Sequence, residues 1–325
     1  MKKSILQIIL YASLLSYIII IFSCNDVPTT SNNKPNNGWA SHPINFSGKL
    51  FGVSFVNATT GIAVGEIGEI VKSFDGGNSW TGVGSNTNYW LRSIKFINPA
   101  TAVAVGSSGM IIRTEDSGTT WNQLTCENTN VLNGVSFIDI NVGYVTGYAG
   151  SLYKTVTRGA TWIHCPEVNI SMNGIFFIDA ESGTVCGSGG KIFRTYNGGL
   201  NWIACSSGVG YDLNAVSFVN ALTGVVVGNM GVILTTFDGG QSWNVRQAPV
   251  YYTLFGVSFP ALGRITAVGG AGTIVTSTDW GSTWQQQISN VNVNLNAVHF
   301  LDVNTGMVVG DNGMTLNTTT GGEAY

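Results

Sequence analysis

Beyond residue 38 the chain repeats one pattern of short apolar runs separated by polar turns. The second copy reads LRSIKFINPATAVAVGSSGMIIRTEDSGTTW, with apolar runs at 91–96, 101–106 and 110–114 and a fourth run leaving from its final tryptophan. Runs of this length between Asn, Asp, Gly and Thr clusters predict strands joined in an antiparallel meander. No stretch after residue 24 keeps the 3.6-residue period of a helix. The pattern therefore predicts an all-β protein made of four-stranded units.

The spacing of tryptophans gives the number of units. A tryptophan recurs every 40 or 41 residues, at Trp39, Trp80, Trp121, Trp162, Trp202, Trp243 and Trp284. One further step reaches Tyr325, so seven periods fit and no second domain is left over. Four-stranded repeats of about 40 residues are typical of β-propeller blades. The sequence predicts a seven-bladed β-propeller over residues 38–325.

The two ends of the repeat predict how the ring closes. Trp39 precedes Phe55 by the same 16 residues that separate Trp80 from Phe96, so it lies on an outer strand ahead of the first complete blade. The last repeat ends at TTTGGEAY, with almost nothing left for its own outer strand. The N-terminal strand is therefore expected to complete the last blade, which removes two exposed sheet edges.

An octet such as SFDGGNSW, residues 73–80, ends the third strand of each unit. An aspartate in it can bond amides of its own turn, glycines can adopt positive φ, and the tryptophan can pack into the blade. Three copies replace the aspartate with Thr157, Asn197 or Thr320. A catalytic acid is not expected to recur four times at equivalent positions of different blades. We therefore interpret the following residues as structural: Asp75, Trp80, Asp116, Trp121, Trp162, Trp202, Asp238, Trp243, Asp279 and Trp284.

This octet resembles the Asp-box, or BNR repeat, of sialidases, sortilin-type receptors and several glycosidases. Together with the preceding VGxxGxIxxT pattern, it most resembles the photosystem II assembly/stability factor family. The resemblance spans residues 39–325 and implies a seven-bladed propeller that serves as an assembly scaffold, often as a lipoprotein. The matching residues are those that build blades, so the resemblance speaks to the fold more than to the function.

Composition and motifs argue against several classes of function. Only 10% of residues are charged and the net charge is -3, which disfavours nucleic acid as a partner. A sialidase needs three converging arginines and a glycosidase needs two facing carboxylates, and neither arrangement is singled out here. The histidines lack triad spacing and the cysteines lack metal-site spacing. We therefore expect no enzyme activity, no cofactor and no metal, with Cys126, Cys165, Cys186 and Cys205 as buried thiols.

The first 37 residues predict export and attachment to a membrane. A basic start and an uncharged apolar run from Ile5 to Phe22 lead to Ser23 and Cys24, an order that resembles a lipoprotein signal with Cys24 as the lipidated residue. The alternative is an uncleaved N-terminal anchor, since such a run can just span a bilayer. Residues 25–37 lack large apolar side chains and predict a disordered tether. Either interpretation predicts a periplasmic or cell-surface protein.

Two sets of residues remain as candidate sites. Four consecutive units carry a cation at one position of the third strand: Lys72, Arg113, Lys154 and Arg194. This basic arc could meet an acidic partner, or its alkyl stems could pack between blades while the charged heads find carboxylates or solvent.

The second set lies in loops opposite the octets and forms a candidate binding face: Tyr89, Trp90, Arg92, Tyr148, Tyr211, Asp212, Arg246, Tyr251 and Tyr252. Exposed aromatic side chains are enriched at interfaces, although they could also cap the seams between blades. Arg92 shares one repeat position near the expected channel mouth with Asn133, Asn173, Asn214 and Asn296.

The functional expectation is a non-catalytic, tethered and monomeric propeller that binds a protein or a glycan. The alternatives are an assembly factor for a membrane complex, as the resemblance implies, and a glycan-processing enzyme.

Overall fold

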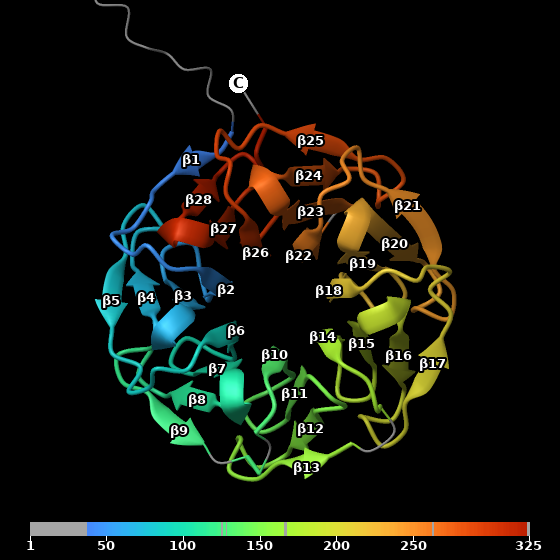
Figure 1. The fold of residues 1–325 in the computed structure, drawn as a ribbon, viewed down its shortest axis with the longest axis horizontal. Coiled ribbons are helices and arrows are strands. Elements are labelled where there is room, and N and C mark those ends of the chain that lie inside the picture. Colours follow the sequence, from blue (N-terminus) through green and yellow to red (C-terminus); the bar gives the residue numbers. More distant parts are fainter. Residues whose placement is uncertain (1–37, 125, 128, 166–167, 262, 324–325) are drawn as a thin grey trace, which may run out of the picture. The chain divides into compact units, whose positions relative to one another are not determined.

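The computed structural model describes residues 38–124, 126–127, 129–165, 168–261 and 263–323. Their strands form seven four-stranded antiparallel sheets arranged in a ring, which confirms the predicted seven-bladed propeller (Figure 1). Among these residues there is no helix long and apolar enough to cross a membrane. Cys24, the apolar run and the tether lie outside the described residues.

Each blade has an inner strand beside the channel and a second strand next to it. The inner strands are β2 (Leu50–Phe55), β6 (Leu91–Phe96), β10 (Leu132–Phe137), β14 (Met172–Phe177), β18 (Leu213–Phe218), β22 (Leu254–Ala261) and β26 (Leu295–Phe300). The second strands are β3 (Gly61–Gly65), β7 (Ala102–Gly106), β11 (Gly143–Gly147), β15 (Gly183–Gly187), β19 (Gly224–Gly228), β23 (Arg264–Gly269) and β27 (Gly306–Gly310).

The third and fourth strands complete the blades towards the rim. The third strands are β4 (Ile70–Ser73), β8 (Ile111–Thr114), β12 (Leu152–Thr155), β16 (Ile192–Thr195), β20 (Val232–Thr236), β24 (Ile274–Ser277) and β28 (Thr315–Thr318). The outer strands are β5 (Thr81–Val83), β9 (Asn122–Leu124), β13 (Ile163–His164), β17 (Ile203–Cys205), β21 (Asn244–Gln247), β25 (Gln285–Gln287) and β1 (Ala40–Ser41). Short 3-10 turns link second to third strands in six blades: η1 (Glu66–Gly68), η2 (Ser107–Gly109), η3 (Ser188–Gly190), η4 (Asn229–Gly231), η5 (Gly270–Gly272) and η6 (Asp311–Gly313).

The hydrophobic core lies between neighbouring blades. The second strands are buried along their whole length, apart from the half-buried Arg264 at the start of β23, because each is covered by a blade on both faces. One core cluster joins Ile62 and Ile70 of the first blade to Leu91 and Phe96 of the second, and six further clusters repeat this arrangement around the ring. Blade-to-blade packing therefore holds the ring together.

The N-terminal strand completes the last blade, as the sequence predicted. β1 pairs antiparallel with β28, with Ala40 opposite Asn317 and Ser41 opposite Leu316 (Figure 1). The indole of Trp39 is buried and meets Phe300 edge-on at 6.0 Å between ring centroids. Trp80 meets Phe55 in the same way in the first blade, at 5.9 Å. Trp39 therefore takes the place of the tryptophan that the last repeat lacks.

The octets form closed hydrogen-bonded turns. In the first, the Asp75 carboxylate accepts bonds from the Ser73 hydroxyl and from both the amide and the hydroxyl of Ser79. These bonds, those from Ser79 first, lower the pKa of Asp75 to about 2. The second glycine, Gly77, has φ +83°, and a side chain there would collide with Met307 of the last blade. Each octet thus fits against the preceding blade.

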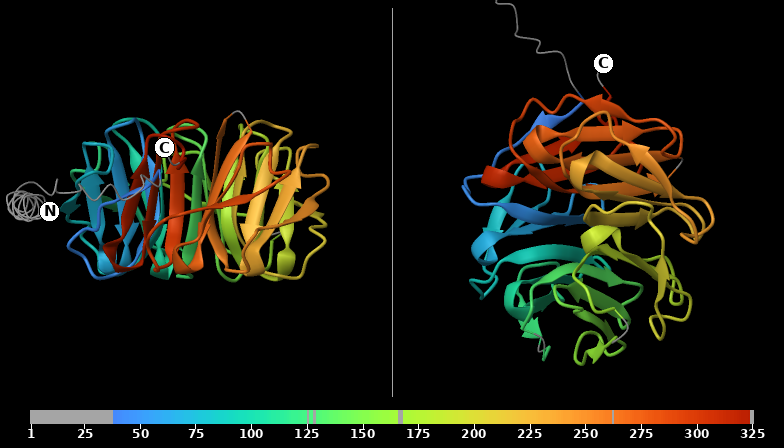
Figure 2. Two further views of the ribbon diagram at one scale, coloured as in Figure 1. Left: turned by 90° about the horizontal axis from the view of Figure 1, so that it is seen from above. Right: turned by 45° about the vertical axis from the view of Figure 1, so that its right-hand side comes forward.

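The ring has two different faces, seen edge-on in Figure 2. The octet face carries the octets and the turns between first and second strands. An octet and a turn of the same blade are joined by a hydrogen bond, as where Gly76 N–H donates to the Thr59 carbonyl. The loop face carries the 3-10 turns and the loops between blades, joined where Glu66 N–H donates to the Lys49 carbonyl. Cys165 and Cys186 are buried, whereas Cys126 and Cys205 are half-buried.

Candidate binding site at the channel mouth

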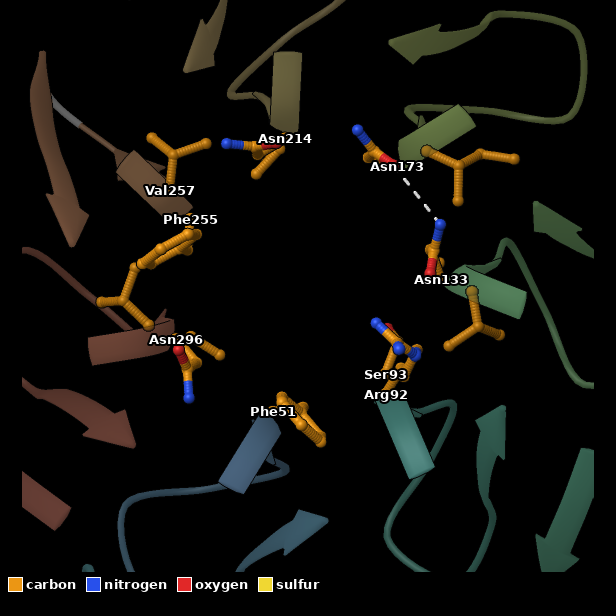
Figure 3. Close-up of a pocket in the computed structure, with 18 of the residues that line it drawn as sticks. Phe51, Arg92, Ser93, Asn133, Asn173, Asn214, Phe255, Val257 and Asn296 are labelled. Carbon is orange, nitrogen blue, oxygen red and sulfur yellow. Dashed lines mark hydrogen bonds between the residues drawn. The ribbon is translucent and has the colours of Figure 1, made fainter. Parts of the chain in front are cut away.

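The second residue of every inner strand lines the channel at its loop-face end (Figure 3). This mouth ring contains one residue from each blade: Phe51, Arg92, Asn133, Asn173, Asn214, Phe255 and Asn296. Asparagine occupies four of the seven places, so the other three depart from the repeat.

The asparagines connect neighbouring blades. Each donates its side-chain amide to the carbonyl that begins the next inner strand: Asn133 to Met172, Asn173 to Leu213, Asn214 to Leu254 and Asn296 to Leu50, at 2.8–3.2 Å. Inner strands are sheet edges, whose free backbone groups need partners. The asparagine ring therefore has a structural reason to recur.

The three departures bring apolar and cationic groups into the mouth. The guanidinium of Arg92 lies 5.7 Å from the ring centroids of both Phe51 and Trp90, and those two rings are themselves 5.7 Å apart. Aromatic faces attract a cation and restrict its movement. Arg92 Nε is buried without a hydrogen-bond partner. On the other side of the ring, Phe255 adds a second aromatic side chain.

A cavity of about 630 Å³ opens above the mouth ring. Its charged side chains are Lys49, Arg92, Asp212 and Asp311, so both signs are present. A smaller space of about 190 Å³ lies in the channel at the ring and is also lined by the next two residues of each inner strand. A wide mouth that carries both positive and negative charges and some aromatic side chains suits an extended polar ligand with apolar side chains better than a simple ion.

The structure places the predicted binding-face residues at different distances from this mouth. Arg92, Tyr148 and Asp212 line the cavity itself. Trp90 contacts the mouth ring through Phe51 and is 40% exposed. The remaining aromatic residues are exposed in the loops: Tyr89, Tyr211, Tyr251 and Tyr252. Arg246 lies apart from them, on outer strand β21 opposite Ile233.

Residues of the predicted basic arc contact the neighbouring blade. Lys72, Arg113 and Arg194 are buried, and Lys154 is half-buried. Arg113 donates to the carbonyl of Arg158 at 2.7 Å and Lys154 to that of Gly198 at 2.6 Å, both in the octet of the next blade. The two charged heads thus bind backbone carbonyls of the next blade, and Arg113 also pairs with the Glu115 carboxylate at 3.2 Å. The sequence had left packing between blades as one of two alternatives, with carboxylates or solvent as the expected partners of the heads.

Sequence reasoning missed the apolar half of the mouth. Phe51 and Phe255 occupy the repeat position of Arg92, within two copies of the segment LFGVSF. A signal was present, because phenylalanine is unusual at a place held by asparagine in four copies. Lys49, one residue before β2, was missed as well.

The described residues contain no group of three or more His, Cys, Asp or Glu side chains that could hold a metal ion. The two carboxylates of the mouth are held by hydrogen bonds. Asp311 accepts from the amides of Asn294 and Asn296, and Asp212 accepts from the N–H of Gly189.

Comparisons with known proteins agree with this architecture. The profile of the family described as photosynthesis system II assembly factor YCF48 matches residues 31–165, 163–248 and 246–319. A search of curated protein sequences finds no match.

Similar solved structures include YCF48 bound to D1 peptide, at 19% identity and a TM-score of 0.74, covering 87% of this chain and 97% of that one. YCF48 from Cyanidioschyzon merolae has 18% identity and a TM-score of 0.72, covering 86% and 98%. The GH74 xyloglucanase from Xanthomonas campestris has 12% identity and a TM-score of 0.71, with 87% of this chain matching 54% of that enzyme. The family match extends over nearly the whole propeller, and the chain belongs to the YCF48 family of photosynthesis system II assembly factors.

Proposed function

We propose that this protein is a non-catalytic assembly scaffold that binds an extended segment of a partner protein at the mouth of its channel. The proposal includes export and attachment to a membrane through the N-terminal segment. Assembly of a membrane complex fits this role, and photosystem II is the case that the family name describes.

The observation that carries the proposal is the cluster of Arg92, Phe51 and Trp90 beside an open mouth of both charges. An arginine held by aromatic rings offers directional donors to a peptide carbonyl or carboxylate. The rings offer apolar contact, and aromatic and arginine side chains dominate the energetics of protein interfaces. The exposed tyrosines around the mouth extend the same chemistry, with Tyr251 as the most exposed of them at 75%.

Peptide binding by a relative supports the same conclusion. The similar structure of YCF48 carries a D1 peptide, so a propeller of this family accepts a segment of another protein. The mouth carboxylates support a non-catalytic role, because Asp212 and Asp311 are engaged in bonds that fix turns and the asparagine ring.

Membrane attachment is supported by the sequence. The apolar run from Ile5 to Phe22 and the following Cys24 precede a polar stretch of about a dozen residues.

The test is selection of peptides from a displayed random library, using the wild type, the double variant Trp90→Ala/Tyr252→Ala and Tyr196→Ala. Tyr196 is a matched control, since it is 46% exposed but lies on the octet face beside Arg194. We expect the wild type and the control to enrich the same peptides. The double variant should lose at least ~2 kcal/mol of binding with little change in melting temperature.

Two outcomes contradict the proposal. One is equal binding of the selected peptides by the double variant. The other is failure of the wild type to enrich any peptide while it binds components of a glycan array through Trp90, which would identify a glycan-binding protein instead.

A further inference from the structure

A second ring of side chains lies deeper along the inner strands, towards the octet face. It is formed by the fifth residue of each strand: Ser54, Lys95, Ser136, Phe176, Ser217, Ser258 and His299. We call this set the lower ring. Serine holds four of its places, so Lys95, Phe176 and His299 depart from the repeat.

The recurring serines have a structural task. The Ser54 hydroxyl accepts a bond from Phe96 N–H of the next blade at 3.0 Å, and Ser136 and Ser258 do the same for Phe177 and Phe300. They satisfy edge N–H groups of the adjacent inner strand. His299 keeps this task in the last blade, where its Nδ1 accepts from Phe55 N–H at 3.0 Å.

That bond fixes the tautomer of His299. Because Nδ1 accepts, the proton of the neutral imidazole is on Nε2, which is left as a donor. Burial, followed by the nearby charge of Lys95, lowers the pKa of His299 to about 3. The imidazole is therefore neutral at ordinary pH. Lys95, on the inner strand two blades further along the ring, contributes to this lowered pKa through its charge.

Lys95 has no structural task of this kind, because an ammonium cannot accept a bond from a backbone N–H. Burial lowers the pKa of Lys95. In the described part of the chain, ion pairs join only Arg113, Arg158 and Arg264 to carboxylates. Lys95 thus stands on a channel-lining strand without a counter-charge, an arrangement that is unfavourable unless something supplies one.

We propose that the lower ring is a binding site for a small oxyanion, a carboxylate or a phosphate group, held by Lys95, Ser54 and His299 from three consecutive blades. Lys95 supplies charge and up to three donors, and His299 supplies Nε2–H. Ser54 accepts from Phe96, which leaves its own hydroxyl proton to donate. Three side chains that can each donate a hydrogen bond match a ligand that only accepts. This site lies on the other side of the mouth ring from the peptide site and does not depend on it.

The experiment measures thermal melting and calorimetric titration with sodium phosphate and, separately, sodium acetate, at constant ionic strength set with sodium chloride. The variants are Lys95→Ser and His299→Ser, which restore the residue common at this position, and Lys95→Met, which keeps the alkyl stem. Lys191→Ser is the control, because it removes one positive charge from an exposed lysine in the turn after η3.

We expect phosphate, acetate or both to stabilise the wild type and the Lys191→Ser control equally. Both Lys95 variants should bind the anion about tenfold more weakly or worse, as for the loss of one charge-assisted hydrogen bond. Without added anion they should melt at or above the wild-type temperature, because a half-buried charge without a counter-charge has been removed. The two salts distinguish a phosphate site from one for a peptide carboxylate.

The proposal is overturned if neither salt stabilises the wild type, or if the Lys95 variants respond as the wild type does. Since Lys95→Ser and Lys95→Met change the packing differently, a folding failure of one leaves the other to decide. Peptide selection by these variants should be unchanged, so failure here and failure of the peptide site are distinguishable.

Discussion

Replacing Trp39 with alanine tests how the ring is closed. Trp39 is only 4% exposed, packs against Phe300 and donates from Nε1 to the Gln287 side chain at 2.9 Å. The strand that follows it has only two residues, and two further backbone bonds, to Thr315 and Gly313, continue its pairing. The indole is therefore the largest buried side chain that attaches this short strand to the last blade.

The expected loss combines removal of a large side chain from the core with loss of a hydrogen bond. Substitution of a buried tryptophan by alanine costs about 3–5 kcal/mol of unfolding free energy, and a hydrogen bond adds about 1 kcal/mol. Trp121→Ala is the matched control, because Trp121 is 3% exposed but precedes an outer strand covalently continuous with its own blade. Both variants should lose similar stability in urea unfolding.

The two variants should differ in local opening. With Trp39 absent, β1 can detach and expose the edge of β28. The amide hydrogens of β28 then exchange with solvent, and the exposed edge can pair with strands of other chains. Hydrogen exchange under native conditions should show lost protection in β28 for Trp39→Ala and retained protection there for Trp121→Ala. Equal protection of β28 in both variants, or unchanged stability of Trp39→Ala, would refute the closure mechanism.

Two further predictions concern the octets and the mouth ring. The pKa of Asp279, like that of Asp75, is lowered to about 2 by bonds within its octet, first from the amide of Thr283. A pKa that is lower in the folded state stabilises the protein above about pH 4, and this stabilisation is lost as the pH falls towards 2. In a plot of melting temperature against pH, Asp279→Asn should therefore show a smaller fall over this range than the wild type. Asn173→Ala removes the hydrogen bond to the Leu213 carbonyl and should lower the free energy of unfolding in urea by about 1–3 kcal/mol. A decrease of less than a few tenths of a kcal/mol would mean that a water molecule replaces the side-chain amide as the donor.

The sequence allowed the architecture to be predicted because the same physical requirements recur in every blade. The 41-residue spacing of tryptophans set the number of blades, and the displaced Trp39 set the closing strand. The strand and turn patterns are local to each repeat, and the number of blades follows from counting the repeats. Fold prediction needed no knowledge of which residues meet across the ring.

The candidate sites were harder to predict for the opposite reason. Phe51 and Phe255 are 204 residues apart in the chain, and only closure of the ring brings them to one mouth. Arg246 was grouped with the nearby tyrosines from sequence proximity, yet strand β21 carries it to the rim. His299 was set aside because the histidines lack triad spacing, and Lys95 was not singled out because one lysine within a strand forms no motif.

Closure by the first strand also has a consequence for biosynthesis. Residues 40 and 317 are partners, so strand β1 leaves the ribosome long before the last repeat with which it pairs. Contacts of such long sequence separation form late and slowly. Throughout synthesis the newest blade presents an open side to its surroundings, and the unfinished ring is vulnerable to aggregation.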